Sequence, residues 1–149
     1  MLAEDQQVLH DALSWAEQGQ KLWLVSVART WGTAPRPVDS WAVIAADGRL
    51  SGSVSGGCIE DDLVARMRAG ELDQPLPFLL KYGISADEAH RFGLPCGGSL
   101  QLVVEPAPAL AMLRELQQRL ASGERLLRSV DLCSARLTVG VWRRAMRLV

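Results

Sequence analysis

The chain has 149 residues, of which 48% are hydrophobic and 22% are charged, and its formal net charge is -1. This composition excludes a disordered chain and is typical of a globular domain with a core of its own. The apolar runs are far shorter than the roughly 20 residues of a membrane-spanning helix, and Glu4 and Asp5 lie where a signal peptide is basic, so we expect a cytoplasmic protein without a membrane span.

The first half of the chain alternates between helical and extended patterns. Apolar residues from Val8 to Ala16 recur at helical spacing, and Gly19 ends the pattern. The dipeptide Asp47-Gly48 separates two apolar runs, which is typical of a tight turn between strands. We expect, in chain order, a helix over about 4–18, a strand over 22–28, a loop over 29–40, and strands over 41–46 and 50–54.

The second half begins with a helix after Cys58, because apolar residues at helical spacing follow carboxylates in the first turn and precede Gly70. A long polar segment over 82–98 is expected as a loop, and loops of that length in compact domains are usually functional or disordered. The other expected elements are strands over 76–81, 100–105, 126–132 and 137–142 and a helix over 110–120. The pattern predicts one compact α/β domain, with α+β as a variant, in which helices flank a mixed β-sheet.

Two cysteines lie beside paired glycines, at Gly56-Gly57-Cys58 and at Cys96-Gly97-Gly98. Paired glycines allow positive φ and let a ligand approach the backbone. The first motif leaves a strand and enters a helix, so its amides are expected to be bare at the positive helix end, where an anion can bind and the pKa of a thiol is lowered. The alternative is a tight junction around a buried cysteine. An odd count of three cysteines argues against a disulfide scaffold.

Other polar residues have two interpretations each. Arg36 is either a forked donor for phosphate or a surface ion-pair partner. Glu60 either caps the helix start or accepts a proton near Cys58, and Tyr82 and His90 are either hydrogen-bond donors of a site or solvated loop residues. Zinc is disfavoured because no CxxC or HxxxH spacing is present. The arginine-rich segment after residue 106 lacks a nucleic-acid module, so we expect a solvated or interface-forming face and no nucleic-acid partner.

Several pieces together resemble the amino-terminal domain of the XdhC/CoxI family over about residues 20–106. They are Thr33-Ala34-Pro35-Arg36-Pro37, Asp47-Gly48, the run from Gly52 to Glu60, Phe92-Gly93-Leu94 and Cys96-Gly97-Gly98. The resemblance implies an accessory factor, more a chaperone than an enzyme, that binds the molybdenum cofactor as molybdopterin or its dinucleotide. It also implies help with sulfuration of that cofactor and insertion into a molybdenum hydroxylase apoenzyme, such as xanthine or carbon monoxide dehydrogenase.

The resemblance also implies partners, domains and a site. Besides the apoenzyme, a sulfurtransferase and a second copy of the chain are expected partners. Residues 1–106 would form the family's amino-terminal domain, and 107–149 would complete it or lead toward a Rossmann domain that this sequence does not contain. No catalytic residue or metal ligand is assigned. The expected cofactor-binding residues are Arg36, Ser53, Ser55, Gly56, Gly57, Cys58, Glu60, Cys96, Gly97 and Gly98. Among them, the backbone of 55–57 with Arg36 would hold phosphate, and the two cysteines would contact sulfur or metal.

Two other classes of function stay open at this point. A thiol redox protein would join Cys58 and Cys96 reversibly. A protein-interaction module without a cofactor would instead present tryptophans on a docking surface, although most tryptophans fill cores.

Overall fold

A computed structural model describes residues 2–31, 40–55, 58–83, 99–124, 126–130, 132 and 137–141. The elements run in this order: α1 (Leu2–Glu17), β1 (Leu22–Trp31), β2 (Trp41–Ala45), β3 (Leu50–Gly52), α2 (Cys58–Arg68), β4 (Phe78–Tyr82), β5 (Ser99–Pro106), α4 (Leu110–Ala121), β6 (Leu126–Val130) and β7 (Leu137–Val141). The predicted helices and strands are confirmed within a few residues at each end. The largest difference is at β1, which continues past the expected residue 28 to Trp31.

The strands form a five-stranded sheet in the order β3-β2-β1-β5-β4 and a separate pair, β6-β7. The expected class, helices flanking a β-sheet in one compact domain, is confirmed, but the expectation of a mixed sheet is wrong. Every strand pairing among the described residues is antiparallel. The short turn between Ala45 and Leu50 permits only this direction, because a parallel crossover needs a dozen residues or more. The observed sheet therefore corresponds to the α+β variant.

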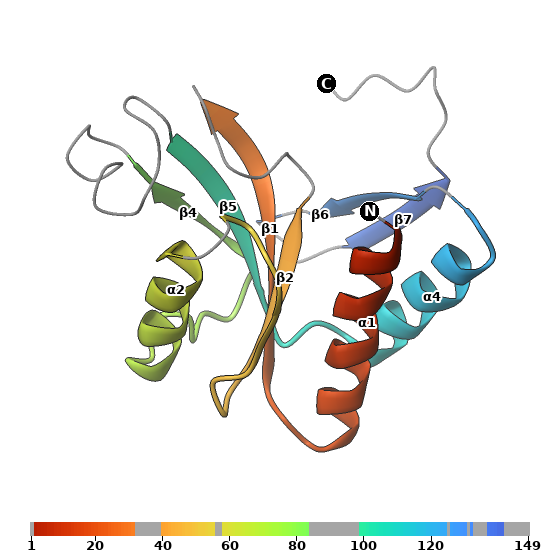
Figure 1. The fold of residues 1–149 in the computed structure, drawn as a ribbon, viewed down its shortest axis with the longest axis horizontal. Coiled ribbons are helices and arrows are strands. Elements are labelled where there is room, and N and C mark those ends of the chain that lie inside the picture. The colour runs from red at the N-terminus through yellow and green to blue at the C-terminus, as the bar shows by residue number, and fades with distance from the viewer. Residues whose placement is uncertain are drawn as a thin grey trace.

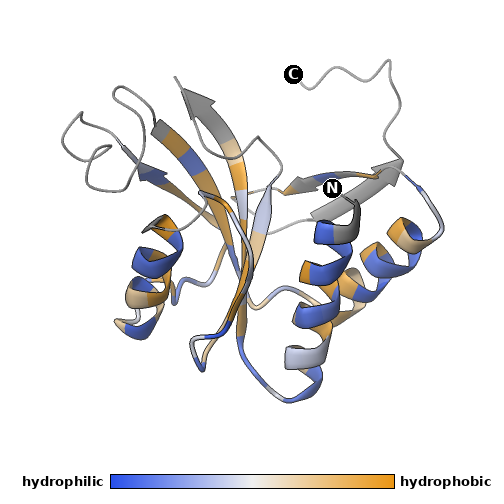
Figure 2. Ribbon diagram, in the orientation of Figure 1, coloured by the Kyte–Doolittle hydropathy of each residue, from blue (hydrophilic) through white to orange (hydrophobic). Residues whose placement is uncertain are grey.

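Helices cover both faces of the five-stranded sheet, α2 on one side and α1 with α4 on the other (Figure 1). Alternate residues of β1 point to opposite faces, as a pleated strand requires. Trp23 and Val25 are buried in the core beneath α2, whereas Leu22 and Leu24 are buried beneath α1 and α4. Apolar residues accordingly dominate the central strands (Figure 2). Within the part of the chain that the structure describes, no helix has the length and apolarity to cross a bilayer.

Candidate functional site

The segments that carry the sequence motifs are flanked by strand ends on one side of the fold. At the end of β1, Trp31 pairs with Ser99, the first residue of β5. The last residue of β4, Tyr82, pairs with Leu100, and the last residue of β3, Gly52, pairs with Ala42 near the start of β2. The described residues on either side of 32–39, 56–57 and 84–98 thus lie at the same end of the sheet (Figure 1).

The turn after β3 is held by the buried carboxylate of Glu60. One oxygen, Oε1, accepts hydrogen bonds from the Val54 amide at 2.7 Å, the Ser55 amide at 2.8 Å and the Ser53 hydroxyl at 3.1 Å. The second oxygen, Oε2, accepts the hydroxyl hydrogen of Ser55. Glu60 is the third residue of α2, where a capping-box carboxylate usually bonds the amide just before the helix. Here it reaches further back and fastens residues 53–55 to the first turn of the helix.

These bonds keep Glu60 ionised. Burial by itself would raise the pKa of the carboxyl, but the hydrogen bonds from Ser55 and from the Val54 amide outweigh it and lower the pKa to about 2. The charge also lies in the first turn of α2, where a carboxylate is favoured by the helix dipole. A permanent anion therefore stands inside the junction between β3 and α2.

The backbone at Gly52 lets the chain enter this turn. Gly52 has a φ of +86°, and a β-carbon there would lie 2.4 Å from the Trp41 carbonyl oxygen and 2.6 Å from a methyl group of Val8. Only glycine avoids both the conformational strain and the collision. The glycine at this position is therefore required by the path of the chain from β3 into the Ser53–Ser55 turn.

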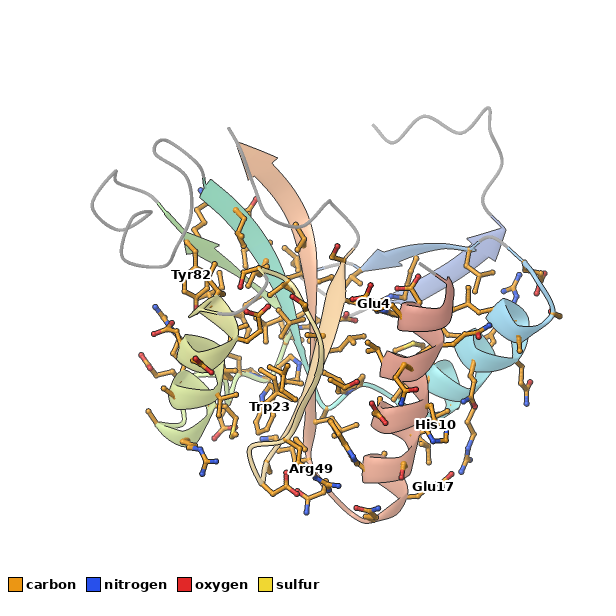
Figure 3. The ribbon with its side chains drawn as sticks, in the orientation of Figure 1. Glu4, His10, Glu17, Trp23, Arg49 and Tyr82 are labelled. Carbon is orange, nitrogen blue, oxygen red and sulfur yellow. The ribbon has the colours of Figure 1, made fainter. Side chains whose placement is uncertain are left out.

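A second carboxylate fastens α2 to the other side of the sheet. The Tyr82 hydroxyl, at the end of β4, donates a 2.6 Å hydrogen bond to Asp62 Oδ2, which also accepts a 2.8 Å bond from Arg66 Nε. The Arg66 guanidinium lies 5.4 Å from the centre of the Tyr82 ring. Burial and the bond to Asp62 raise the pKa of Tyr82, so its hydroxyl stays protonated and remains a donor. Figure 3 shows Tyr82 at the upper end of α2.

The structure brings three of the predicted site residues, Ser53, Ser55 and Glu60, into one hydrogen-bonded cluster. Cys58 is the first residue of α2, so its backbone stands beside this cluster. The Ser55 amide, expected to hold a phosphate together with the backbone of 56–57, donates to Glu60 in this structure. The other predicted site residues lie outside the described residues, and they are Arg36, Gly56, Gly57, Cys96, Gly97 and Gly98.

Sequence reasoning missed the partner of Tyr82 and a buried ion pair on the opposite face of the sheet. There, Arg128 of β6 makes two 2.6 Å hydrogen bonds to the Glu105 carboxylate; Glu105 is buried and Arg128 is partly buried. No local pattern joins residues that are 20 or 23 positions apart, so only the folded chain reveals these pairs. Within the described ranges, no cluster of three or more His, Cys, Asp or Glu side chains is placed to hold a metal ion.

Comparison with known proteins gives a matching family, a similar protein and a similar solved structure. Residues 15–83, which include β1, the Ser53–Ser55 turn, α2 and Tyr82, match the XdhC and CoxI family. The chain is also 32% identical over 131 residues to the molybdenum cofactor insertion chaperone PaoD of Escherichia coli (strain K12), in an alignment that covers 79% of this chain and 38% of the chaperone.

A solved structure shares the fold. The crystal structure of a xanthine dehydrogenase from Bacillus halodurans matches with a TM-score of 0.65 and 19% identity, over 91% of this chain and 42% of that one. The chain spans less than half the length of either relative. The match over residues 15–83 places the likeness to the XdhC and CoxI family in the segment that runs from the end of α1 to the end of β4.

Proposed function

We propose that this chain is an accessory factor that binds the molybdenum cofactor as cargo and assists its sulfuration and insertion into a molybdenum hydroxylase. The observation that carries the proposal is the gathering of the motif-flanking strand ends at one end of the sheet, beside the start of α2. The likeness to a molybdenum cofactor insertion chaperone supports the same class of cargo.

The physical basis is a thiol-bearing helix start that is fixed from two sides. Glu60 ties α2 to the turn after β3, and Asp62 ties it to the end of β4. Cys58 opens this helix, and a thiol suits the soft, sulfur-bound metal of the cargo. Binding to a helix start that is already fixed loses less conformational entropy than binding to a mobile one, so the arrangement favours retention of the cargo.

The proposal also covers the partners of the chain, its location in the cell and the form of its cargo. We expect a cytoplasmic protein that forms a homodimer, receives sulfur from a sulfurtransferase and docks on the apoenzyme. The cargo would be either molybdopterin or its dinucleotide form, held by Cys58 together with Cys96 and with the arginine at position 36.

The experiment that tests the accessory role is reconstitution of an apoenzyme. Purified chain is loaded with molybdenum cofactor under reducing conditions, separated from free cofactor, and mixed with a cofactor-free xanthine dehydrogenase. The proposal predicts that loaded chain restores activity faster than the same quantity of free cofactor, and that a Cys58→Ser, Cys96→Ser variant does not.

Cys133→Ser serves as the thiol control, because no role in the cargo site is proposed for Cys133. Equal activation by free cofactor and by the loaded chain would contradict delivery. A reversible disulfide between Cys58 and Cys96, found by thiol titration with and without reductant, together with no cofactor retention, would favour the redox alternative instead.

A further inference from the structure

The buried carboxylate of Glu60 accepts four hydrogen bonds from the turn after β3. Oε1 takes three hydrogen bonds, from the Ser53 hydroxyl and the Val54 and Ser55 amides, and Oε2 takes one from the Ser55 hydroxyl. An ionised carboxylate has about four lone-pair sites, two on each oxygen, so the bonds from the turn use the full capacity of Oε1. A cofactor group that replaced the Glu60 carboxylate at these donors would release the turn.

The same bonds occupy the amides that an anionic ligand would use. Successive amides in a turn before a helix form a site that phosphate or carboxylate groups fill. In this protein the amides of Val54 and Ser55 point to a carboxylate that belongs to the chain itself, and that carboxylate is ionised and buried. An incoming phosphate would meet both a filled site and a like charge that is poorly screened by solvent.

We propose that Glu60 is a positioning residue that fills the Ser53–Ser55 turn from within the protein, so that the turn fixes the start of α2 and takes no phosphate of the cargo. This inference rests on the proposed function for the identity of the cargo. Glu60 affects cargo binding indirectly, because it fixes the start of α2, where Cys58 lies. The anionic group of the cargo is held by other segments.

The first arm of the test uses the full-length chain without cargo. Amide hydrogen exchange is measured residue by residue for the wild type and for Glu60→Ala, Glu60→Gln and Asp61→Asn. Asp61 is the exposed neighbour in the same helical turn, so its variant removes the same charge at the surface. We expect the Val54 and Ser55 amides to exchange about tenfold faster or more in Glu60→Ala, less so in Glu60→Gln, and unchanged in Asp61→Asn.

The second arm measures cofactor retention at a temperature where every variant is folded. Glu60→Ala should lose retention, and Glu60→Gln should recover part of it because its carbonyl oxygen can accept the amide bonds. Glu105→Gln is the control for stability, since it disturbs a buried carboxylate on the other face of the sheet. A role in stability alone would make Glu105→Gln lose retention as Glu60→Ala does, and that result would overturn the proposal.

The third arm adds inorganic phosphate to the wild type. The Val54 and Ser55 amides should keep their exchange rates, and slower exchange with phosphate would overturn the proposal. Loss of retention in Glu60→Gln while these amides stay protected would also overturn it, because Glu60 would then contact the cargo directly.

If the wild type retains no cofactor, the proposed function fails, while the exchange and phosphate arms still decide whether Glu60 fills the turn.

Discussion

Tyr82 and Asp62 join the end of β4 to the second turn of α2 through a 2.6 Å hydrogen bond. The tyrosine is buried at the point where the sheet meets the motif-bearing end of the fold. Since Glu60 bonds the turn after β3, two carboxylates of one helix hold its first turns against two different strands. This double attachment is the structural basis for a fixed Cys58 backbone.

Tyr82→Phe should destabilise the domain by about 1–2 kcal/mol, because it deletes the donor and leaves the carboxylate of Asp62 with one fewer partner. Urea unfolding at neutral pH measures the change. Because Arg66 still bonds Asp62, the fold should persist. A free energy of unfolding equal to that of the wild type would show that the bond contributes nothing.

Glu60 predicts a specific loss of stability in acid. Its pKa is about 2 in the folded chain against an ordinary 4.5, so its contribution is fully present above pH 4.5 and disappears as pH falls through 2. The shift corresponds to roughly 3 kcal/mol at neutral pH. We therefore expect the free energy of unfolding of the wild type to decrease as the pH is lowered from 4.5 to 2. The free energy of unfolding of Glu60→Gln should decrease less over the same interval. Parallel pH curves for the two proteins would contradict the assignment.

Gly52→Ala should destabilise the domain by more than about 2 kcal/mol, since it combines strain at positive φ with a collision against the Trp41 carbonyl. Gly19→Ala is a matched control, because Gly19 has a φ of +82° and no atom within 4 Å of the added carbon. Its cost should be about 1 kcal/mol. Thermal unfolding of both variants separates the cost of backbone strain from the cost of the steric collision. Equal losses of stability in the two variants would show that the collision at position 52 costs nothing.

Arg128→Met should cost about 3 kcal/mol, because it leaves the buried Glu105 carboxylate without its two-bond partner. Adding Glu105→Gln to this variant removes the unpaired charge, so the double variant should recover most of the loss. Denaturant unfolding of the two single variants and the double variant gives the coupling energy. Additive losses would mean that the two side chains act independently.

Much of the fold follows from local patterns. Helical spacing located α1, α2 and α4, and the Asp47-Gly48 turn located the β2-β3 hairpin. The fully antiparallel pairing of the described strands was not predicted. For example, β1 pairs with β5 across about 70 intervening residues, and no local sequence pattern indicates that pairing. Strand pairing of this kind is decided by tertiary packing.

The candidate site was predictable in part. The run from Ser53 to Glu60 indicated a turn entering a helix, and its described residues are the bend at 54–55 and the start of α2 at Cys58. What the pattern could not show is the destination of the Glu60 side chain, since a carboxylate in a first helical turn has several possible partners. It bonds backward to the Val54 and Ser55 amides and so supports the turn from within the protein.

The most direct test of the proposed function is the amount of molybdenum that stays with the chain. Reduced wild type and Cys58→Ser are incubated with purified molybdenum cofactor, with and without its nucleotide, and then ultrafiltered for metal analysis. A cofactor-handling domain with Cys58 in its site predicts stoichiometric retention by the wild type and a clear loss in Cys58→Ser. Equal retention by both proteins would remove Cys58 from the site, and retention by neither would contradict cofactor binding by this chain.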